Sequence, residues 1–142
     1  MDLSGNGRNT TATQTQRAQA VLIVDDEASV RFFLRNYLQS IGVTEILEAA
    51  NGQEAVQQLN SHPRIRVILT DLKMPVMDGV DAIRLFRAMN PAAVIVILTG
   101  YPRYRGILET VEDGALVLMK PIELDELDRV MDMSLARASL LP

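Results

Sequence analysis

The sequence predicts an α/β fold in which helices cover both faces of a five-stranded parallel sheet. Five short apolar runs alternate along the chain with five segments in which apolar residues recur at helical spacing. Most of these runs are continuous, as is typical of strands that are buried on both faces. Regular alternation of strands and helices implies right-handed crossovers and therefore a parallel sheet.

Each strand is predicted from a short apolar run. The second run has only two residues and is the weakest, so we expect it at an edge of the sheet. The predicted strands cover residues 21–24, 46–47, 67–69, 94–98 and 116–119.

A stripe of apolar residues at three- and four-residue intervals follows each strand and predicts an amphipathic helix. We expect the first helix to end at Gly42, because glycine favours the conformation that closes many helices. The five stripes are Val30, Phe33, Leu34, Tyr37, Leu38 and Ile41; Ala55, Val56 and Leu59; Val80, Ile83 and Phe86; Ile107, Leu108 and Val111; and Leu124, Leu127, Val130, Met131 and Leu135.

The length of 142 residues suits one domain with a substantial core. Residues 1–19 are mostly polar and have little to bury, which predicts a flexible tail ahead of a folded domain over residues 20–142. The chain has no cysteine, which excludes disulfides and thiolate metal sites.

The net charge of -4 argues mildly against direct binding of nucleic acid, since phosphate contacts need a basic surface. No apolar run approaches the length of a membrane span, and the N-terminus lacks the apolar core of a signal peptide. We therefore expect a cytoplasmic protein that binds neither membranes nor nucleic acid directly.

Polar residues stand at the ends of four predicted strands. In a parallel sheet the carboxyl ends of the strands meet at one edge, where ligands bind near the topological switch point. We therefore expect one cluster, made of Asp25, Asp26 and Glu27 after the first strand, Asp71 after the third, Thr99 after the fourth and Lys120 after the fifth.

This cluster is suited to phosphoryl transfer. Clustered carboxylates need a compensating cation, and Mg²⁺ prefers oxygen ligands of this kind. A carboxylate can also attack phosphorus and form an aspartyl phosphate. A metal ion, the hydroxyl of Thr99 and the ammonium of Lys120 could then each neutralise one phosphoryl oxygen.

Each of these residues, taken alone, also has an ordinary structural interpretation. Asp25 and Asp26 could cap the first helix, and Asp71 could belong to a turn. Thr99 and Lys120 could simply face solvent. The combination is more specific than its members, because all of them fall at the same edge of the sheet.

Four segments around these residues resemble the receiver domains of bacterial response regulators in two-component signalling. The segments are VLIVDDE, ILTDLKMPVMDG, VIVILTG and ALVLMKPIEL, and the similarity covers residues 20–138. The resemblance implies a flavodoxin-like (βα)5 fold with strand order 2-1-3-4-5. It also implies a stand-alone receiver, or one isolated from a longer regulator.

The resemblance further implies that Asp71 accepts a phosphoryl group from a sensor histidine kinase or a histidine phosphotransfer protein. It implies a site for Mg²⁺ or Mn²⁺, whose ligands would be Asp25 or Asp26, Asp71 and the backbone carbonyl of Lys73. Asp26 would bind the ion directly, and Asp25 would act largely through water.

Thr99 and Lys120 would bind the phosphoryl oxygens, and the peptide bond before Pro121 is expected to be cis. Val117 stands where the family usually has Tyr or Phe. Readout of the switch through an aromatic rotamer is therefore not expected in this chain.

Three large side chains have possible roles beside the cluster. Lys73 and Tyr101 lie two residues after Asp71 and Thr99, and we predict that they shield the acyl phosphate and lengthen its life. Alternatively, both side chains face solvent. Phe32 lies next to the buried stripe of the first helix and is a candidate docking residue for the kinase, or else a partly covered ring at the edge of the core.

These inferences combine into a phosphorylation-activated switch that controls an unidentified protein, with no enzymatic activity beyond slow self-dephosphorylation. The expected output surface is formed by the fourth helix, fifth strand and fifth helix, which could also form a homodimer. Gly106 weakens the start of the fourth helix. Met119, Met131 and Met133 are adaptable contact residues, although methionine at helical spacing more often lies in the core.

Three alternative functions fit these residues less well. A Mg²⁺-dependent phosphatase of the haloacid-dehalogenase type would want a second Asp where Lys73 stands. A flavin mononucleotide carrier would need a phosphate-binding loop after the first strand, where Asp25 and Asp26 would repel phosphate. A binding module that no longer needs phosphate would not require the intact set of acids.

Overall fold

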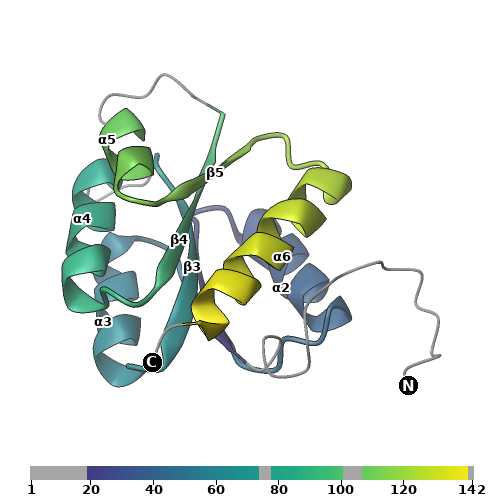
Figure 1. The fold of residues 1–142 in the computed structure, drawn as a ribbon, viewed down its shortest axis with the longest axis horizontal. Coiled ribbons are helices and arrows are strands. Elements are labelled where there is room, and N and C mark those ends of the chain that lie inside the picture. The colour runs from purple at the N-terminus through teal and green to yellow at the C-terminus, as the bar shows by residue number, and fades with distance from the viewer. Residues whose placement is uncertain (1–18, 74–77, 101–106, 141–142) are drawn as a thin grey trace.

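The computed structural model describes residues 19–73, 78–100 and 107–140. Within these ranges, a five-stranded parallel sheet has the order β2-β1-β3-β4-β5, which confirms the predicted fold class and strand order (Figure 1). The strands are β1 (Ala20–Val24), β2 (Ile46–Ala49), β3 (Ile65–Asp71), β4 (Val94–Thr99) and β5 (Leu116–Met119). The weak second run does form an edge strand, and the predicted tail falls almost wholly outside the described residues.

Helices cover both faces of the sheet, with α2 and α6 on one face and α3, α4 and α5 on the other (Figure 1). Their bounds are α2 (Ala28–Ser40), α3 (Gly52–Ser61), α4 (Gly79–Met89), α5 (Ile107–Glu112) and α6 (Leu124–Ser139). Each predicted helix is therefore present. Gly42 follows α2 with a φ of 98°, a backbone conformation that glycine adopts without strain.

The sheet separates two apolar cores because side chains alternate along each strand. In β1, Val21 and Ile23 belong to the core under α2 and α6, whereas Leu22 and Val24 belong to the core under α3 and α4. Both sets are fully buried, which explains the continuous apolar runs of the sequence.

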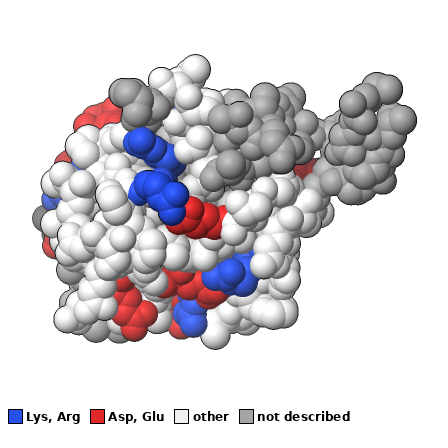
Figure 2. All heavy atoms as spheres, turned by 90° about the horizontal axis from the view of Figure 1, so that it is seen from below, with Lys and Arg blue, Asp and Glu red and all other residues white. Residues whose placement is uncertain are grey.

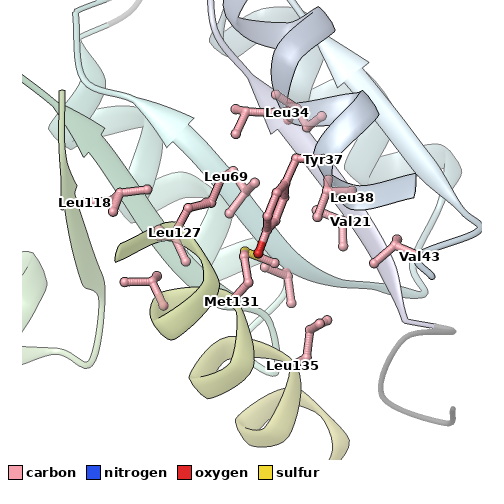
Figure 3. Close-up of a cluster of buried hydrophobic side chains, with 14 of the residues drawn as sticks. Val21, Leu34, Tyr37, Leu38, Val43, Leu69, Leu118, Leu127, Met131 and Leu135 are labelled. Carbon is pink, nitrogen blue, oxygen red and sulfur yellow. The ribbon is translucent and has the colours of Figure 1, made fainter. Parts of the chain in front are cut away.

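A hydrogen bond between two side chains also joins α2 to α6 at the core that these helices cover. Figure 3 shows the ring of Tyr37 reaching from α2 toward Met131 on α6. Its hydroxyl group donates a hydrogen bond of 2.6 Å to Oδ1 of Asp128, which satisfies the phenol within an otherwise apolar core.

The turn after β3 depends on a close approach between two backbone segments. A Cβ atom at Gly79 would lie 2.1 Å from the carbonyl oxygen of Leu72. One residue earlier, the carboxylate of Asp78 caps α4 by accepting a hydrogen bond of 2.9 Å from the amide of Val80. Glycine and the cap together allow α4 to begin directly beside the end of β3.

Three residues that were predicted on buried stripes are exposed. Phe33 is 42%, Leu124 46% and Val111 39% exposed. Helical periodicity identifies a face, but it does not show where that face passes beyond the sheet. Phe33 lies at the border of the core, Leu124 begins α6, and Val111 belongs to the short helix α5.

The charged side chains are mixed in sign on the face that Figure 2 shows. This view looks at the end of the sheet where the strands begin, and acidic and basic groups lie beside one another there in small clusters. No helix in the described parts of the chain is long and apolar enough to cross a membrane.

Candidate functional site

The register of the sheet brings the predicted polar residues to one edge, at the top of Figure 1. Val24 pairs with Thr70, which places Asp25 level with Asp71. Asp71 pairs with Leu98, so the next residue of β4 is Thr99. Thr99 in turn pairs with Met119, and Lys120 follows directly. Residues from four strands therefore reach the same level because parallel strands keep a constant register.

Three carboxylates form the acidic part of the site. Oxygen atoms of Asp25, Asp26 and Asp71 all lie within 4.8 Å of one another. Asp25 has no exposed surface and Asp71 is 6% exposed, whereas Asp26 is exposed. An oxygen-only donor set that is open on one side fits a hard cation such as Mg²⁺, which keeps several water ligands.

Backbone groups hold two of these carboxylates in place. The amide of Glu27 donates a hydrogen bond of 2.9 Å to Oδ1 of Asp25. The amide of Lys73 donates a longer bond of 3.3 Å to Oδ1 of Asp71. In each case the chain folds back so that an amide reaches the carboxylate two residues earlier. These two bonds hold Asp25 and Asp71 at the edge of the sheet.

Lys120 supplies a cationic side chain that contacts two carboxylates of the cluster. Its Nζ atom lies 3.0 Å from Oδ2 of Asp25 and 3.4 Å from Oδ2 of Asp71. Its backbone amide donates to the carbonyl of Thr99, and the Lys120–Pro121 peptide bond is cis, as the resemblance implied. Lys120 thus bridges the ends of β1, β3 and β5.

The pKa of Asp71 is raised above its ordinary value of 3.8. Burial is the main cause, the charge of Lys120 opposes it, and the neighbouring Asp25 adds to it. Burial by itself lowers the pKa of Lys120, but its hydrogen bond and charge interaction with Asp25, together with Asp71, raise it overall. Lys120 is therefore a permanent cation at neutral pH.

The other predicted site residues differ in their exposure. Thr99 is 1% exposed at the end of β4, and the side chain of Lys73 is exposed. Tyr101 lies outside the described residues. Phe32 is 69% exposed and belongs to the surface of α2. Val117 is partly buried against the core under α3 and α4.

A surface depression of about 340 Å³ lies next to Lys120. Residues from the start of α2 and from the segment after β5 line it: Glu27, Ser29, Val30, Phe33, Lys120, Pro121 and Ile122. The exposed part of Phe33, which the sequence placed in the core, faces this depression.

Sequence reasoning missed Arg31, which contacts the loop formed by Asp25 and Asp26 (the acidic loop). Arg31 of α2 donates a hydrogen bond of 2.7 Å from Nη1 to the backbone carbonyl of Asp25. Its Nε atom lies 3.1 Å from Oε1 of Glu48 on β2. Neither residue follows a strand, so the criterion of polar strand ends could not select them.

Comparison with known proteins gives one family. The model for the response regulator receiver domain matches residues 21–132. The transcriptional regulatory protein PdtaR of Mycobacterium tuberculosis is 35% identical over 130 residues, which are 90% of this chain and 62% of PdtaR. The transcriptional regulatory protein ZraR of Escherichia coli is 32% identical over 117 residues, which are 82% of this chain and 26% of ZraR.

Solved structures agree with this result. The chemotaxis protein CheY4 of Vibrio cholerae superimposes with a TM-score of 0.72 at 31% identity, covering 82% of this chain and 99% of that one. A response regulator receiver domain protein from Clostridium thermocellum has a TM-score of 0.76 at 27% identity, covering 85% and 97%. The chain spans less than two thirds of ZraR and of PdtaR, so only the shared domain is comparable.

Proposed function

The chain belongs to the response regulator receiver domain family, and on that basis we propose that Asp71 accepts a phosphoryl group and so switches the surface of this domain. Receiver domains are phosphoacceptor regulators of two-component systems rather than enzymes that turn over a substrate. The donor would be a sensor histidine kinase or a histidine phosphotransfer protein in the cytoplasm. The recipient of the signal would be another protein.

The observation that carries this proposal is the position of Asp71 between other acids and Lys120. The carboxylate lies at the end of β3, almost buried, with an ammonium group 3.4 Å away. A carboxylate oxygen would attack phosphorus while the bond from phosphorus to the histidine nitrogen breaks. The donor imidazole then leaves with the electrons of that bond and takes up a proton.

The residues around Asp71 fit the charge that such a transfer requires. Asp25, Asp26, Asp71 and the backbone carbonyl of Lys73 would hold Mg²⁺ or Mn²⁺, which when bound would neutralise phosphoryl oxygens. Lys120 would exchange its contact with the carboxylate of Asp71 for one with a phosphoryl oxygen. The hydroxyl of Thr99 would bind another oxygen.

The response would spread from Thr99 to the surface of α5, β5 and α6. Phosphorylation of Asp71 adds negative charge at the end of β3, next to Thr99 at the end of β4, the strand that precedes α5 in the chain. Three apolar side chains on β5 and α6 are exposed and available to a partner or a second copy of the chain. They are Met119 at 47%, Leu124 at 46% and Met133 at 41%. Met131 by contrast is fully buried.

A phosphodonor experiment tests the proposal. The protein is incubated with Mg²⁺ and acetyl phosphate, and the intact mass is measured. We expect one added phosphoryl group in the wild type and none in Asp71→Asn. Asp26→Asn serves as a second variant, in which we expect much slower uptake because a metal ligand is weakened. An adduct that persists in Asp71→Asn, or no adduct in the wild type with any donor, would contradict the proposal.

A further inference from the structure

Arg31 of α2 connects the loop of Asp25 and Asp26 to Glu48 on the edge strand β2. Its Nη1 atom donates a hydrogen bond of 2.7 Å to the carbonyl of Asp25, and its Nε atom lies 3.1 Å from the carboxylate of Glu48. We propose that Arg31, oriented by Glu48, is a positioning residue that fixes the Asp25–Asp26 loop for cation binding. This inference rests on the proposed function, because it concerns the same carboxylates.

The carbonyl of Asp25 determines where the next acid points. The peptide unit between Asp25 and Asp26 is planar, so fixing its oxygen also fixes the direction in which the chain continues to Asp26. The other polar groups of Asp25 already have partners. Its amide donates to the carbonyl of Ala49 at 3.1 Å, and its carboxylate contacts Lys120 and the amide of Glu27. The bond from Arg31 completes this set, so the loop leaves β1 in a defined direction.

Glu48 is anchored well enough to orient Arg31. It lies within β2, paired with Ile23 of β1, and its backbone carbonyl accepts a hydrogen bond of 2.9 Å from Gln58. The side chains of Arg31 and Glu48 are only 20% and 32% exposed. Charge-assisted bonds to a partly buried carboxylate are stronger and more directional than bonds between neutral groups.

The site requires arginine rather than lysine. The planar guanidinium group donates in two directions at once, to the carboxylate of Glu48 and to the carbonyl of Asp25. A single ammonium group on a flexible stem cannot hold both acceptors in this geometry. Partners outside the ligand set commonly change metal affinity by about 10–100-fold when they are removed, because they hold the ligands in place.

Arg35 provides a matched control one turn further along α2. Its Nε atom lies 2.5 Å from the other oxygen of Glu48, and Nη2 donates to the carbonyl of Ile46 at 3.0 Å. It therefore shares the same carboxylate and the same helix, but its bonds go to β2 and not to Asp25. Loss of Arg35 should weaken the packing of α2 on β2 without releasing the acidic loop.

The experiment compares Mg²⁺ affinity in Arg31→Met, Arg31→Lys and Arg35→Met by calorimetric titration, with urea unfolding as a measure of stability. We expect Arg31→Met and Arg31→Lys to raise the Kd for Mg²⁺ by about tenfold, and Arg35→Met by less than about twofold. Equal changes in the Arg31→Met and Arg35→Met variants, or no change in either, would overturn the inference. A purely structural role would shift unfolding midpoints but would not separate the two variants in Kd.

A double-mutant cycle tests whether Glu48 acts through Arg31. Glu48→Gln should weaken Mg²⁺ binding in the wild type and have no further effect in Arg31→Met. Additive effects would overturn the role assigned to Glu48. Phosphoryl uptake by the wild type from acetyl phosphate is measured in parallel. Its absence would refute the proposed function, whereas normal uptake with unchanged Mg²⁺ affinity in Arg31→Met would refute only this inference.

Discussion

The ammonium nitrogen of Lys120 lies 3.0 Å from Oδ2 of Asp25, a side chain that has no exposed surface. A buried carboxylate is strongly unfavourable unless a charge and hydrogen bonds compensate it. Lys120 meets this requirement for Asp25 and also contacts Asp71, so one positive charge faces two acids. The cluster therefore keeps a net negative charge that favours a divalent cation.

Replacing Lys120 by methionine should change two properties of the site in opposite directions. Because the ammonium group repels a bound cation, we expect Lys120→Met to lower the Kd for Mg²⁺ by roughly tenfold, or about 1.4 kcal/mol. We expect phosphoryl uptake from acetyl phosphate to become slower, because a phosphoryl oxygen loses its cationic partner. Calorimetry and intact-mass kinetics measure the two effects. Weaker binding of Mg²⁺ in the variant would contradict this account of the charge balance.

The raised pKa of Asp71 predicts a pH-dependent cost to stability in buffer free of divalent ions. A folded-state pKa above 3.8 means that the folded protein binds more protons than the unfolded chain between 3.8 and the raised value. Stability is thus lost as the pH rises through that interval. Asp71→Asn lacks this loss, so we expect its Tm to exceed that of the wild type by a few degrees at pH 7. The difference should shrink below pH 3.8, and a difference that is independent of pH would contradict the prediction.

Gly79 should tolerate no side chain. A Cβ atom there would meet the backbone of Leu72 at 2.1 Å, and backbone cannot move aside cheaply. We expect Gly79→Ala to reduce the free energy of unfolding by about 1–3 kcal/mol, measured by urea titration. Gly100→Ala is the matched control, because a Cβ atom at Gly100 would have no neighbour within 4 Å. Its effect should stay within about 0.5 kcal/mol, and an equal loss in both variants would argue against the steric explanation.

Lys73 and Tyr101 should slow the loss of the phosphoryl group. The amide of Lys73 lies 3.3 Å from the carboxylate of Asp71, so its side chain starts beside the site. We expect the double variant Lys73→Ala, Tyr101→Ala to have a several-fold shorter phosphoryl half-life, because water reaches the acyl phosphate more easily. Decay of the phosphorylated mass after removal of the donor gives the half-life. A half-life that is unchanged or longer in the double variant would rule out shielding.

Phe32 should matter for a protein donor and not for a small one. Its ring is 69% exposed on α2, the helix that follows Asp25 and Asp26 in the chain. We expect Phe32→Ala to slow phosphotransfer from a histidine kinase or phosphotransfer protein by about tenfold, or about 1.4 kcal/mol. Phosphorylation by acetyl phosphate should not change. Leu85→Ala on α4, a side chain that is 38% exposed, is the control and should behave as wild type with both donors. A deficit with acetyl phosphate would show that Phe32 acts on the site itself.

The sequence by itself determined the order of the elements and the residues at the strand ends. Short continuous apolar runs that alternate with helical stripes are typical of strands covered on both faces, so β1, β3 and β4 were predictable without coordinates. A constant parallel register then carries Asp25, Asp71, Thr99 and Lys120 to one edge. Periodicity failed for Phe33 and Leu124, because a helical stripe does not record where the helix leaves the sheet.

Only the tertiary structure decided which partners these residues have. Arg31 and Glu48 are 17 positions apart, and nothing in their local sequence pairs a helix residue with the neighbouring edge strand. Likewise, Lys120 reaches Asp25 across 95 positions because β1, β3, β4 and β5 end at the same level. Hydrogen bonds and charge contacts depend on distance in space, and folding sets that distance between segments that the sequence leaves far apart.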